Sequence, residues 1–194
     1  IIALIISFII GPWIIHILQK KQIGEEIHQR GPESHMKKRG TPTMGGVIIL
    51  TAVLLPTLLL AKLNNPLVQI IIFATLWMGL IGFIDDYLKV VKKLSLGLIA
   101  RYKLVGQIFL GCIVSYWIFQ IPDYIDISTK TTVPFFKNVE LDLGFLYPIM
   151  VILVITGTSN AVNLTDGLDG LLAGLLAISF SVFSAITYIT RRFD

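Results

Sequence analysis

Hydrophobic residues occur in six long runs that contain no charged residue, separated by shorter polar segments. The runs cover residues 1–18, 44–61, 67–84, 104–121, 144–164 and 171–190. A helix needs about 20 mostly apolar residues to cross a bilayer. Lipid offers no hydrogen-bonding partner to an open backbone, so each run has to be helical to span it. The pattern therefore predicts an all-α protein, a polytopic transmembrane bundle with six spans in this chain.

Composition supports the membrane assignment. Hydrophobic residues make up 55% of the 194 and charged residues only 14%, against about 25% charged residues in soluble domains. A single cysteine, Cys112, excludes an internal disulfide. The chain starts within an apolar run without Met, and Asp194 closes another such run. We therefore expect residues 1–194 to be one integral-membrane domain that is the N-terminal part of a longer protein.

Basic residues predict the orientation of the spans. Six spans place the loops at 19–43, 85–103 and 165–170 on one side, and this side holds eleven of the sixteen Lys and Arg residues. Loops rich in Lys and Arg stay in the cytoplasm, so these three loops are predicted to be cytoplasmic. The net charge of +4 then reflects topology, and nucleic acid is not an implied partner. The opposite-side segment 122–142 is predicted to be a short hairpin or an amphipathic piece on the outer surface.

Two adjacent carboxylates, Asp85 and Asp86, follow the third run at its cytoplasmic border. They repel each other and lie near the carbonyl groups at the end of a helix. Both arrangements are unfavourable unless cations neutralise the negative charge. A solvated helix end is one interpretation. Metal binding or proton abstraction is the other, because carboxylates that leave room for water and phosphate oxygens suit magnesium.

Three lysines come within two turns of these carboxylates. They are Lys89, Lys92 and Lys93. Lys89 lies four residues after Asp85, and Lys93 four residues after Lys89. On a continuing helix, the side chains of Asp85, Lys89 and Lys93 would therefore share one face. They form intrahelical ion pairs, or they place a metal beside a binding point for a phosphate, for which Lys is a common ligand.

A denser polar cluster lies at the cytoplasmic end of the fifth run. Asn160, Asn163, Asp166 and Asp169 are spaced by three residues, among several glycines that let a ligand approach the backbone. Amides and acids this close to the bilayer are expensive and usually functional. Capping of the next helix by Asp166 or Asp169 explains one aspartate, but not both together with the two asparagines.

The exit of the first cytoplasmic loop carries the parts of an anion site. Residues 38–46 read Lys-Arg-Gly-Thr-Pro-Thr-Met-Gly-Gly. Lys38 supplies a cation and Thr43 a hydroxyl, beside glycines that leave the backbone bare. The two histidines of the same loop have no neighbouring Cys, and we do not assign a zinc site to them.

These three clusters together resemble the phospho-N-acetylmuramoyl-pentapeptide transferases, a branch of the polyprenyl-phosphate N-acetylhexosamine-1-phosphate transferase superfamily. The resemblance is carried by residues 38–46, by Asp85-Asp86-Tyr87 with the following lysines, and by Asn-Ala-Val-Asn-Leu-Thr-Asp-Gly-Leu-Asp-Gly-Leu at 160–171. The motifs occur in the family's order and at matching span positions, from the first residues to about residue 190.

The resemblance implies a magnesium-dependent enzyme of the bacterial inner membrane with about ten spans, usually a homodimer, whose active site faces the cytoplasm. Its substrates would be UDP-MurNAc-pentapeptide and undecaprenyl phosphate, and its products lipid I and UMP, in peptidoglycan synthesis. The family also carries a further catalytic aspartate and a histidine-rich loop later in the chain. We therefore expect the 194 residues alone to be inactive.

Residue roles are carried over by position. Asp85 and Asp86 match the catalytic aspartate pair, and Asp85 is the candidate for deprotonating the lipid phosphate. The resemblance implies metal or diphosphate contacts for Asn163 and Asp166. The remaining substrate-binding candidates are Asp169 for uracil, Lys38 and Thr43 for the nucleotide, Lys89 and Lys93 for the lipid phosphate, and Asn160.

There are three alternatives, one within the same superfamily and two from other classes of protein. A sister transferase would use another UDP-amino-sugar, but residues 38–46 and the 160–171 motif favour the muramoyl branch. A secondary transporter would need acids within its spans, and every Asp and Glu lies outside the six runs. A purely structural anchor leaves the cytoplasmic Asn and Asp residues unexplained.

Overall fold

The protein is described by a computed structural model over residues 2–20, 44–94, 97–121, 129–133, 136, 139–166 and 170–190. Each of the six apolar runs forms a helix, which confirms the prediction of an all-α polytopic membrane bundle. The helices are α1 (Ile2–Lys20), α3 (Gly46–Leu60), α4 (Pro66–Val90), α5 (Ala100–Phe119), α6 (Tyr147–Thr165) and α7 (Leu171–Thr190). A 3-10 turn, η2 (Gly144–Leu146), leads into α6.

The second run forms a shorter helix than its apolar length suggests. Met44 adopts a left-handed backbone (φ 69°) and Ala61 an extended one, so α3 is confined to the 15 residues Gly46–Leu60. At about 1.5 Å per residue, such a helix is roughly 22 Å long, less than the ~30 Å hydrocarbon core. The other five helices are long and apolar enough to cross a membrane.

The third run forms a longer helix than predicted. The Asn65 side chain caps α4 by accepting a hydrogen bond from the Leu67 N–H at 2.9 Å, and Pro66 occupies the first turn, where its missing N–H costs nothing. The helix then continues to Val90. Asp85 and Asp86 are therefore part of its last two turns, rather than following the span as the sequence suggested.

The segment between α5 and α6 contains a hairpin, one of the two forms predicted for it. Strand β1 (Lys130–Thr132) pairs antiparallel with β2 (Glu140–Asp142), with Thr131 opposite Leu141. At its base, the Thr129 hydroxyl and the Gly144 N–H both donate to Asp142 Oδ1, at 2.6 and 2.9 Å. These two donors hold the pKa of the Asp142 carboxyl below its usual value.

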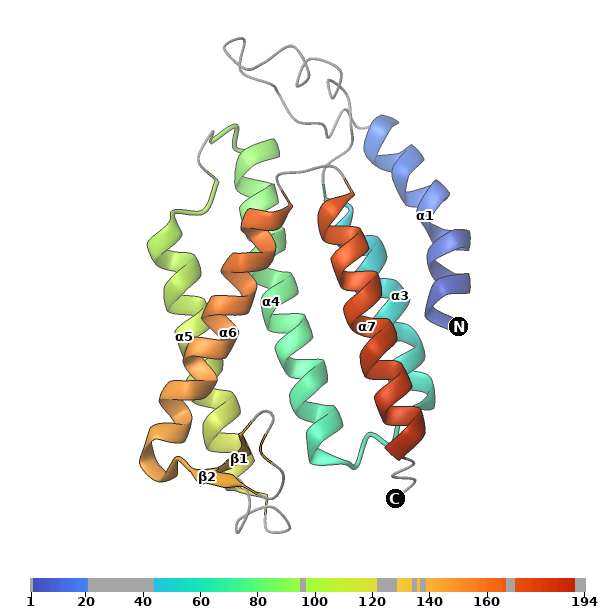
Figure 1. Cartoon of the computed structure of the whole chain (residues 1–194). Helices are drawn as coiled ribbons and strands as arrows, with labels where there is room; N and C mark the ends of the chain where they lie inside the picture. Colours follow the sequence, from blue (N-terminus) through green and yellow to red (C-terminus); the bar gives the residue numbers. More distant parts are fainter. Residues whose placement is uncertain are drawn as a thin grey trace.

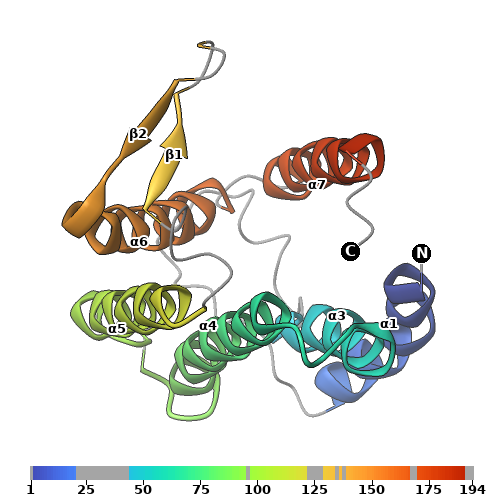
Figure 2. The ribbon, with the colours of Figure 1, turned by 90° about the horizontal axis from the view of Figure 1, so that it is seen from below.

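The helices form two layers. Seen along the bundle, α5, α4, α3 and α1 make a curved row, while α6 covers α5 and α7 lies apart on the same side as α6 (Figure 2). The most extensive helix contact is between α5 and α6, followed by α1 with α3 and α4 with α5. The described helix ends next to the three predicted cytoplasmic loops all lie at one end of the bundle, the upper end in Figure 1, and the hairpin lies at the other.

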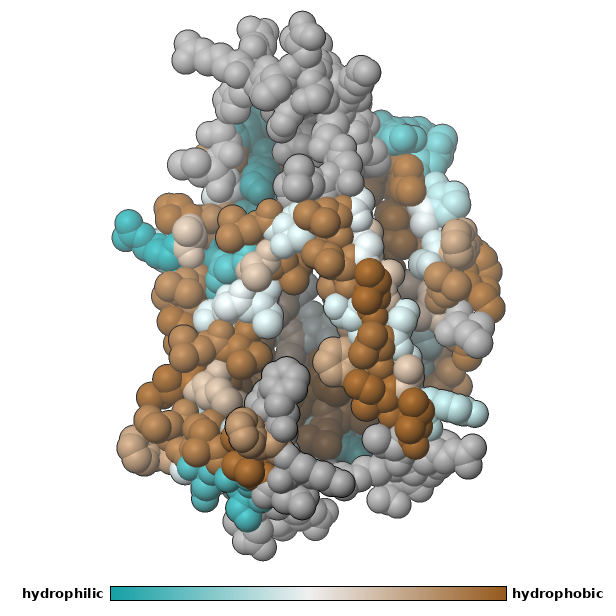
Figure 3. Space-filling model, viewed as in Figure 1, coloured by the Kyte–Doolittle hydropathy of each residue, from teal (hydrophilic) through white to brown (hydrophobic). Residues whose placement is uncertain are grey.

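The buried core is small and lies between α4, α5 and α6. Ile70, Leu110, Val114 and Ile121 are its buried members, flanked by Trp77 and other large side chains. Many large apolar side chains are otherwise exposed, and they cover most of the described surface on the face seen in Figure 3, with the strongest hydrophilic colour toward the two ends of the bundle. This is the distribution of a helix bundle whose solvent is lipid.

Glycines let α5 approach both of its neighbours. A Cβ at Gly106 would lie 2.8 Å from the Ile81 side chain of α4, and one at Gly111 would lie 2.7 Å from the Ile152 side chain and 3.0 Å from the Ile152 backbone of α6. The Trp77 indole N–H donates to the Gly106 carbonyl at 2.9 Å. Small residues at helix contacts are typical of membrane bundles, and here they make α5 the shared partner of α4 and α6.

Candidate active site

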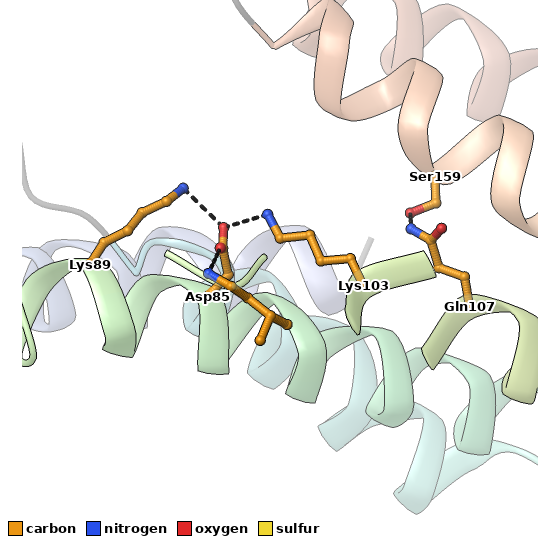
Figure 4. A network of polar contacts seen from close by, with 6 residues as sticks. Asp85, Lys89, Lys103, Gln107 and Ser159 are labelled. Carbon is orange, nitrogen blue, oxygen red and sulfur yellow. Dashed lines mark hydrogen bonds and ion pairs between the residues drawn. The ribbon is translucent and has the colours of Figure 1, made fainter. Parts of the chain in front are cut away.

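Asp85 is the centre of a polar network at the predicted cytoplasmic end of the bundle. Its side chain projects from α4, and the residue is only 8% exposed. The ammonium groups of Lys89 and Lys103 each lie 2.9 Å from Asp85 Oδ2, and the Leu98 N–H donates to Oδ1 at 2.8 Å. Figure 4 shows the two lysines approaching the carboxylate from opposite directions. A buried carboxylate is costly unless it is paired and hydrogen-bonded, and three donors from three segments provide this.

The connection between α4 and α5 folds closely over this carboxylate. Gly97 has a left-handed backbone (φ 59°), and a Cβ there would lie 2.5 Å from Asp85 Oδ1 and 2.7 Å from Lys89 Cε. Only glycine combines this conformation with so close an approach. Gly97 therefore allows the next residue, Leu98, to present its N–H to Asp85.

Asp86 belongs to a different contact. It is half-buried and accepts a hydrogen bond from the backbone of Met44, the residue that precedes α3. Met44 lies at the end of the 38–46 motif. The aspartate pair is thus divided, with Asp85 facing α5 and Asp86 facing the start of α3.

The prediction that Lys93 shares the face of Asp85 and Lys89 is wrong. Helix α4 ends at Val90, with Val91 as its C-cap, and Lys93 has a left-handed backbone (φ 53°). The four-residue spacing that places Lys89 beside Asp85 stops with the helix, so it does not extend to Lys93. The intrahelical ion pair between Asp85 and Lys89 does form, but it is only one part of the network.

A second set of polar contacts joins α5 to α6. Gln107, one turn beyond Lys103 on α5, donates from Nε2 to Ser159 Oγ at 3.0 Å. Asn160 Nδ2 donates to Gln107 Oε1 at 2.9 Å and to the Thr156 carbonyl at 2.7 Å. The predicted site residue Asn160 is therefore tied to the helix that also carries the partner of Asp85.

Asn163 and Asp166 lie at the same end of α6 as Asn160. Asn163 is in the last turn and Asp166 is the C-cap, and both residues are exposed. The remaining predicted site residues, Lys38, Thr43 and Asp169, lie outside the described residues.

Sequence reasoning missed two of the residues that organise this site, Lys103 and Gln107. In the sequence, Lys103 is one of many basic residues of a predicted loop, and Gln107 lies inside an apolar run. The signal for Gln107 was present: an amide within a predicted span, four residues after a lysine, is expensive in lipid and commonly functional.

The donors at the end of α6 suit magnesium in their chemistry. Asp166 offers a carboxylate and Asn163 an amide oxygen, and magnesium is commonly held by one or two carboxylates together with water and substrate phosphate. Across the described parts of the chain, no three His, Cys, Asp or Glu side chains come together as a metal site. The chemistry of these two donors therefore fits a magnesium ion, whose remaining ligands other groups would supply.

Comparison with known proteins agrees with this arrangement of motifs. The profile of glycosyl transferase family 4 matches residues 68–194, and signature 1 of phospho-N-acetylmuramoyl-pentapeptide-transferase matches residues 38–50. The chain is 48% identical over 187 residues to the phospho-N-acetylmuramoyl-pentapeptide-transferase of Pelobacter propionicus, covering 96% of this chain and 51% of the relative. The transferase of Chlorobium chlorochromatii is also 48% identical, with 96% and 50% coverage, and that of Desulforapulum autotrophicum 46%, with 98% and 52%. The chain thus spans about half the length of the curated relatives it matches.

Proposed function

The chain belongs to glycosyl transferase family 4, and from this premise we propose that the protein transfers phospho-N-acetylmuramoyl-pentapeptide from UDP to undecaprenyl phosphate. The products would be lipid I and UMP, the former an intermediate of peptidoglycan synthesis. The observation that carries the proposal is the convergence, at one end of the bundle, of the aspartate–lysine network of α4 and α5 with the amide cluster of α6.

Charge at this site suits phosphoryl transfer. The reaction needs positioning and charge stabilisation more than covalent help from the protein. A diphosphate donor and a phosphate acceptor bring several negative charges together, and Lys89 and Lys103 offer two ammonium groups at the membrane border. We propose that Asp85 positions the ammonium groups of these two lysines, and that the lysines bind the phosphate of the lipid substrate when it enters the site.

Between the two aspartates, Asp86 has more capacity to take a proton from the lipid phosphate. Both oxygens of Asp85 are engaged by the three donors described above. Asp86 accepts a backbone hydrogen bond from Met44 and is only half-buried. We therefore assign proton abstraction to Asp86 and a positioning role to Asp85, in place of the base role first expected for Asp85.

Magnesium would supply further positive charge against the diphosphate, held on the protein side by Asn163 and Asp166. Lys38, Thr43 and Asp169 would recognise the nucleotide. We further propose the bacterial inner membrane as location, with the site facing the cytoplasm, and a homodimer as the assembly.

A transfer assay on the full-length protein tests the proposal. Purified protein is incubated with undecaprenyl phosphate, magnesium and either UDP-MurNAc-pentapeptide or UDP-N-acetylglucosamine, and lipid product and UMP are measured. The muramoyl donor is expected to give equal amounts of both products, and the other donor neither. Transfer from UDP-N-acetylglucosamine alone would indicate the sister activity, and uptake of a substrate without UMP release would indicate a transporter.

A further inference from the structure

Gln107 is the most deeply buried amide side chain among the described residues of the spans, with 4% of its surface exposed. It lies on the face of α5 that also carries Lys103, Leu110 and Gly111, at helical spacings of three and four residues. Packing alone does not call for an amide here, because a leucine of similar size would fill the space without the cost of burying polar atoms. The bonds that Gln107 makes therefore indicate why it is there.

Those bonds fix the orientation of Asn160. The Thr156 carbonyl can only accept a hydrogen bond, so the atom of Asn160 that lies 2.7 Å from it is the amide nitrogen. The second hydrogen of the same nitrogen goes to Gln107 Oε1 at 2.9 Å. With both hydrogens used, Asn160 Oδ1 is directed to the opposite side of the amide group as a fixed acceptor.

The orientation of Gln107 follows from that of Asn160. The Asn160 amide nitrogen can only donate, so the Gln107 atom 2.9 Å from it is Oε1. Gln107 Nε2 is then left to donate to Ser159 Oγ at 3.0 Å (Figure 4 shows the contact with Ser159). One turn earlier on α5, Lys103 reaches Asp85. The same face of α5 thus orients the carboxylate network of α4 and an amide of α6.

We infer that Gln107 is a positioning residue of the transfer site, which acts by holding the Asn160 amide with its oxygen available to the nucleotide-sugar substrate. The inference rests on the proposed function. Gln107 itself does not touch the substrate. Its loss leaves Asn160 with a single fixed bond, to Thr156, so the amide is free to rotate away from the binding geometry.

Steady-state kinetics of the full-length enzyme test the inference, with Gln107→Leu, Asn160→Ala and the double variant. Gln107→Leu is expected to raise the KM for the nucleotide-sugar substrate by about tenfold, the upper range for one hydrogen bond, with a smaller change in kcat. The double variant is expected to be no worse than Asn160→Ala alone, because Gln107 acts through Asn160.

Ser115→Ala is the matched control, since Ser115 is also buried on α5 but donates to the Gly111 carbonyl of its own helix. Its KM is expected to equal that of the wild type. A KM effect of Ser115→Ala as large as that of Gln107→Leu, or losses that multiply in the double variant, would assign Gln107 to packing and overturn the inference. Failure of the proposed function is seen separately, since the wild-type protein would then release no UMP from the donor.

Discussion

Lys103, in the first turn of α5, reaches Asp85 in the last two turns of α4, with 2.9 Å between Nζ and Oδ2. The two residues are eighteen positions apart in the sequence. Their contact, together with the hydrogen bond from the Leu98 N–H to Asp85, joins the end of α4 to the connection that follows it and to the start of α5. Lys89 makes an ion pair of the same length from within α4. The two lysine side chains differ in solvent exposure, and the effect of this difference on stability can be tested.

Replacing Lys103 should destabilise the protein more than replacing Lys89. The Lys103 side chain is 25% exposed and that of Lys89 is 45% exposed, and solvent screens the more exposed pair more strongly. Lys103→Gln is expected to lower the free energy of unfolding by about 1–3 kcal/mol, and Lys89→Gln by less than about 1 kcal/mol. Thermal unfolding in detergent measures both, and equal shifts would contradict the ranking.

The two aspartates should separate in stability while sharing a loss of activity. Asp85→Asn and Asp86→Asn are each expected to reduce transfer by about 10²–10⁴-fold, the range of acid–base and electrostatic contributions. Only Asp85→Asn should also lower the unfolding temperature, because it leaves two ammonium groups without their carboxylate. Near-normal lipid I formation by Asp86→Asn would rule out Asp86 as the base, and near-normal formation by Asp85→Asn would rule out the positioning role of Asp85.

Gly97→Ala should disrupt the cover over Asp85. The substitution meets both an unfavourable left-handed backbone and a contact of 2.5 Å with Asp85 Oδ1. Gly144→Ala is the control, because Gly144 also has a positive φ (46°) but no neighbour within 4 Å of the added Cβ. A left-handed backbone alone costs a non-glycine residue about 1–2 kcal/mol, and this cost is common to both variants. Gly97→Ala is therefore expected to exceed its control in loss of both stability and activity. Identical behaviour of the two variants would show that the close approach to Asp85 is unimportant.

The orientation of the bundle can be read from thiol labelling in a Cys112→Ser background. A cysteine at Gln29 should react with a membrane-impermeant reagent only after the cytoplasmic side is opened, whereas one at Thr131, in strand β1, should react in intact cells. The reverse pattern would invert the topology and place the proposed site outside the cell.

Nucleotide recognition and metal chemistry should separate within the 160–171 motif. Asp169→Ala is expected mainly to raise the KM for the UDP-sugar, because a contact to uracil acts equally in the ground and transition states. Asn163→Ala and Asp166→Ala are expected mainly to lower kcat, and excess magnesium should restore part of that loss. Steady-state kinetics at two magnesium concentrations decide the matter, and the same changes in all three variants would refute this division.

The fold could be predicted because each membrane helix corresponds to one continuous run of about 20 apolar residues without charge. Runs without charge located the six described helices to within a few residues, apart from α4, whose last two turns are polar and extend past the end of its apolar run. The hairpin and the Asp85–Lys89 pair were also accessible, since both depend on nearby residues.

Contacts between helices were not accessible in the same way. The pairing of Asp85 with Lys103 depends on the path of the connection around Gly97, and that of Gln107 with Asn160 on the close approach of α5 and α6 at Gly111. Neither distance follows from local spacing. Lys93 shows the converse error, because a helical pattern was extended past the residue at which the helix ends.

The close contacts of α5 have a consequence for genetics. Gly106 meets the end of a flexible side chain on α4, whereas Gly111 meets backbone as well as side chain on α6, and backbone cannot move aside at little cost. Alleles that add a side chain at Gly111 should therefore be the more severe, growing at low temperature and failing at high temperature. Suppressors should arise at Ile152, where a smaller residue restores the space.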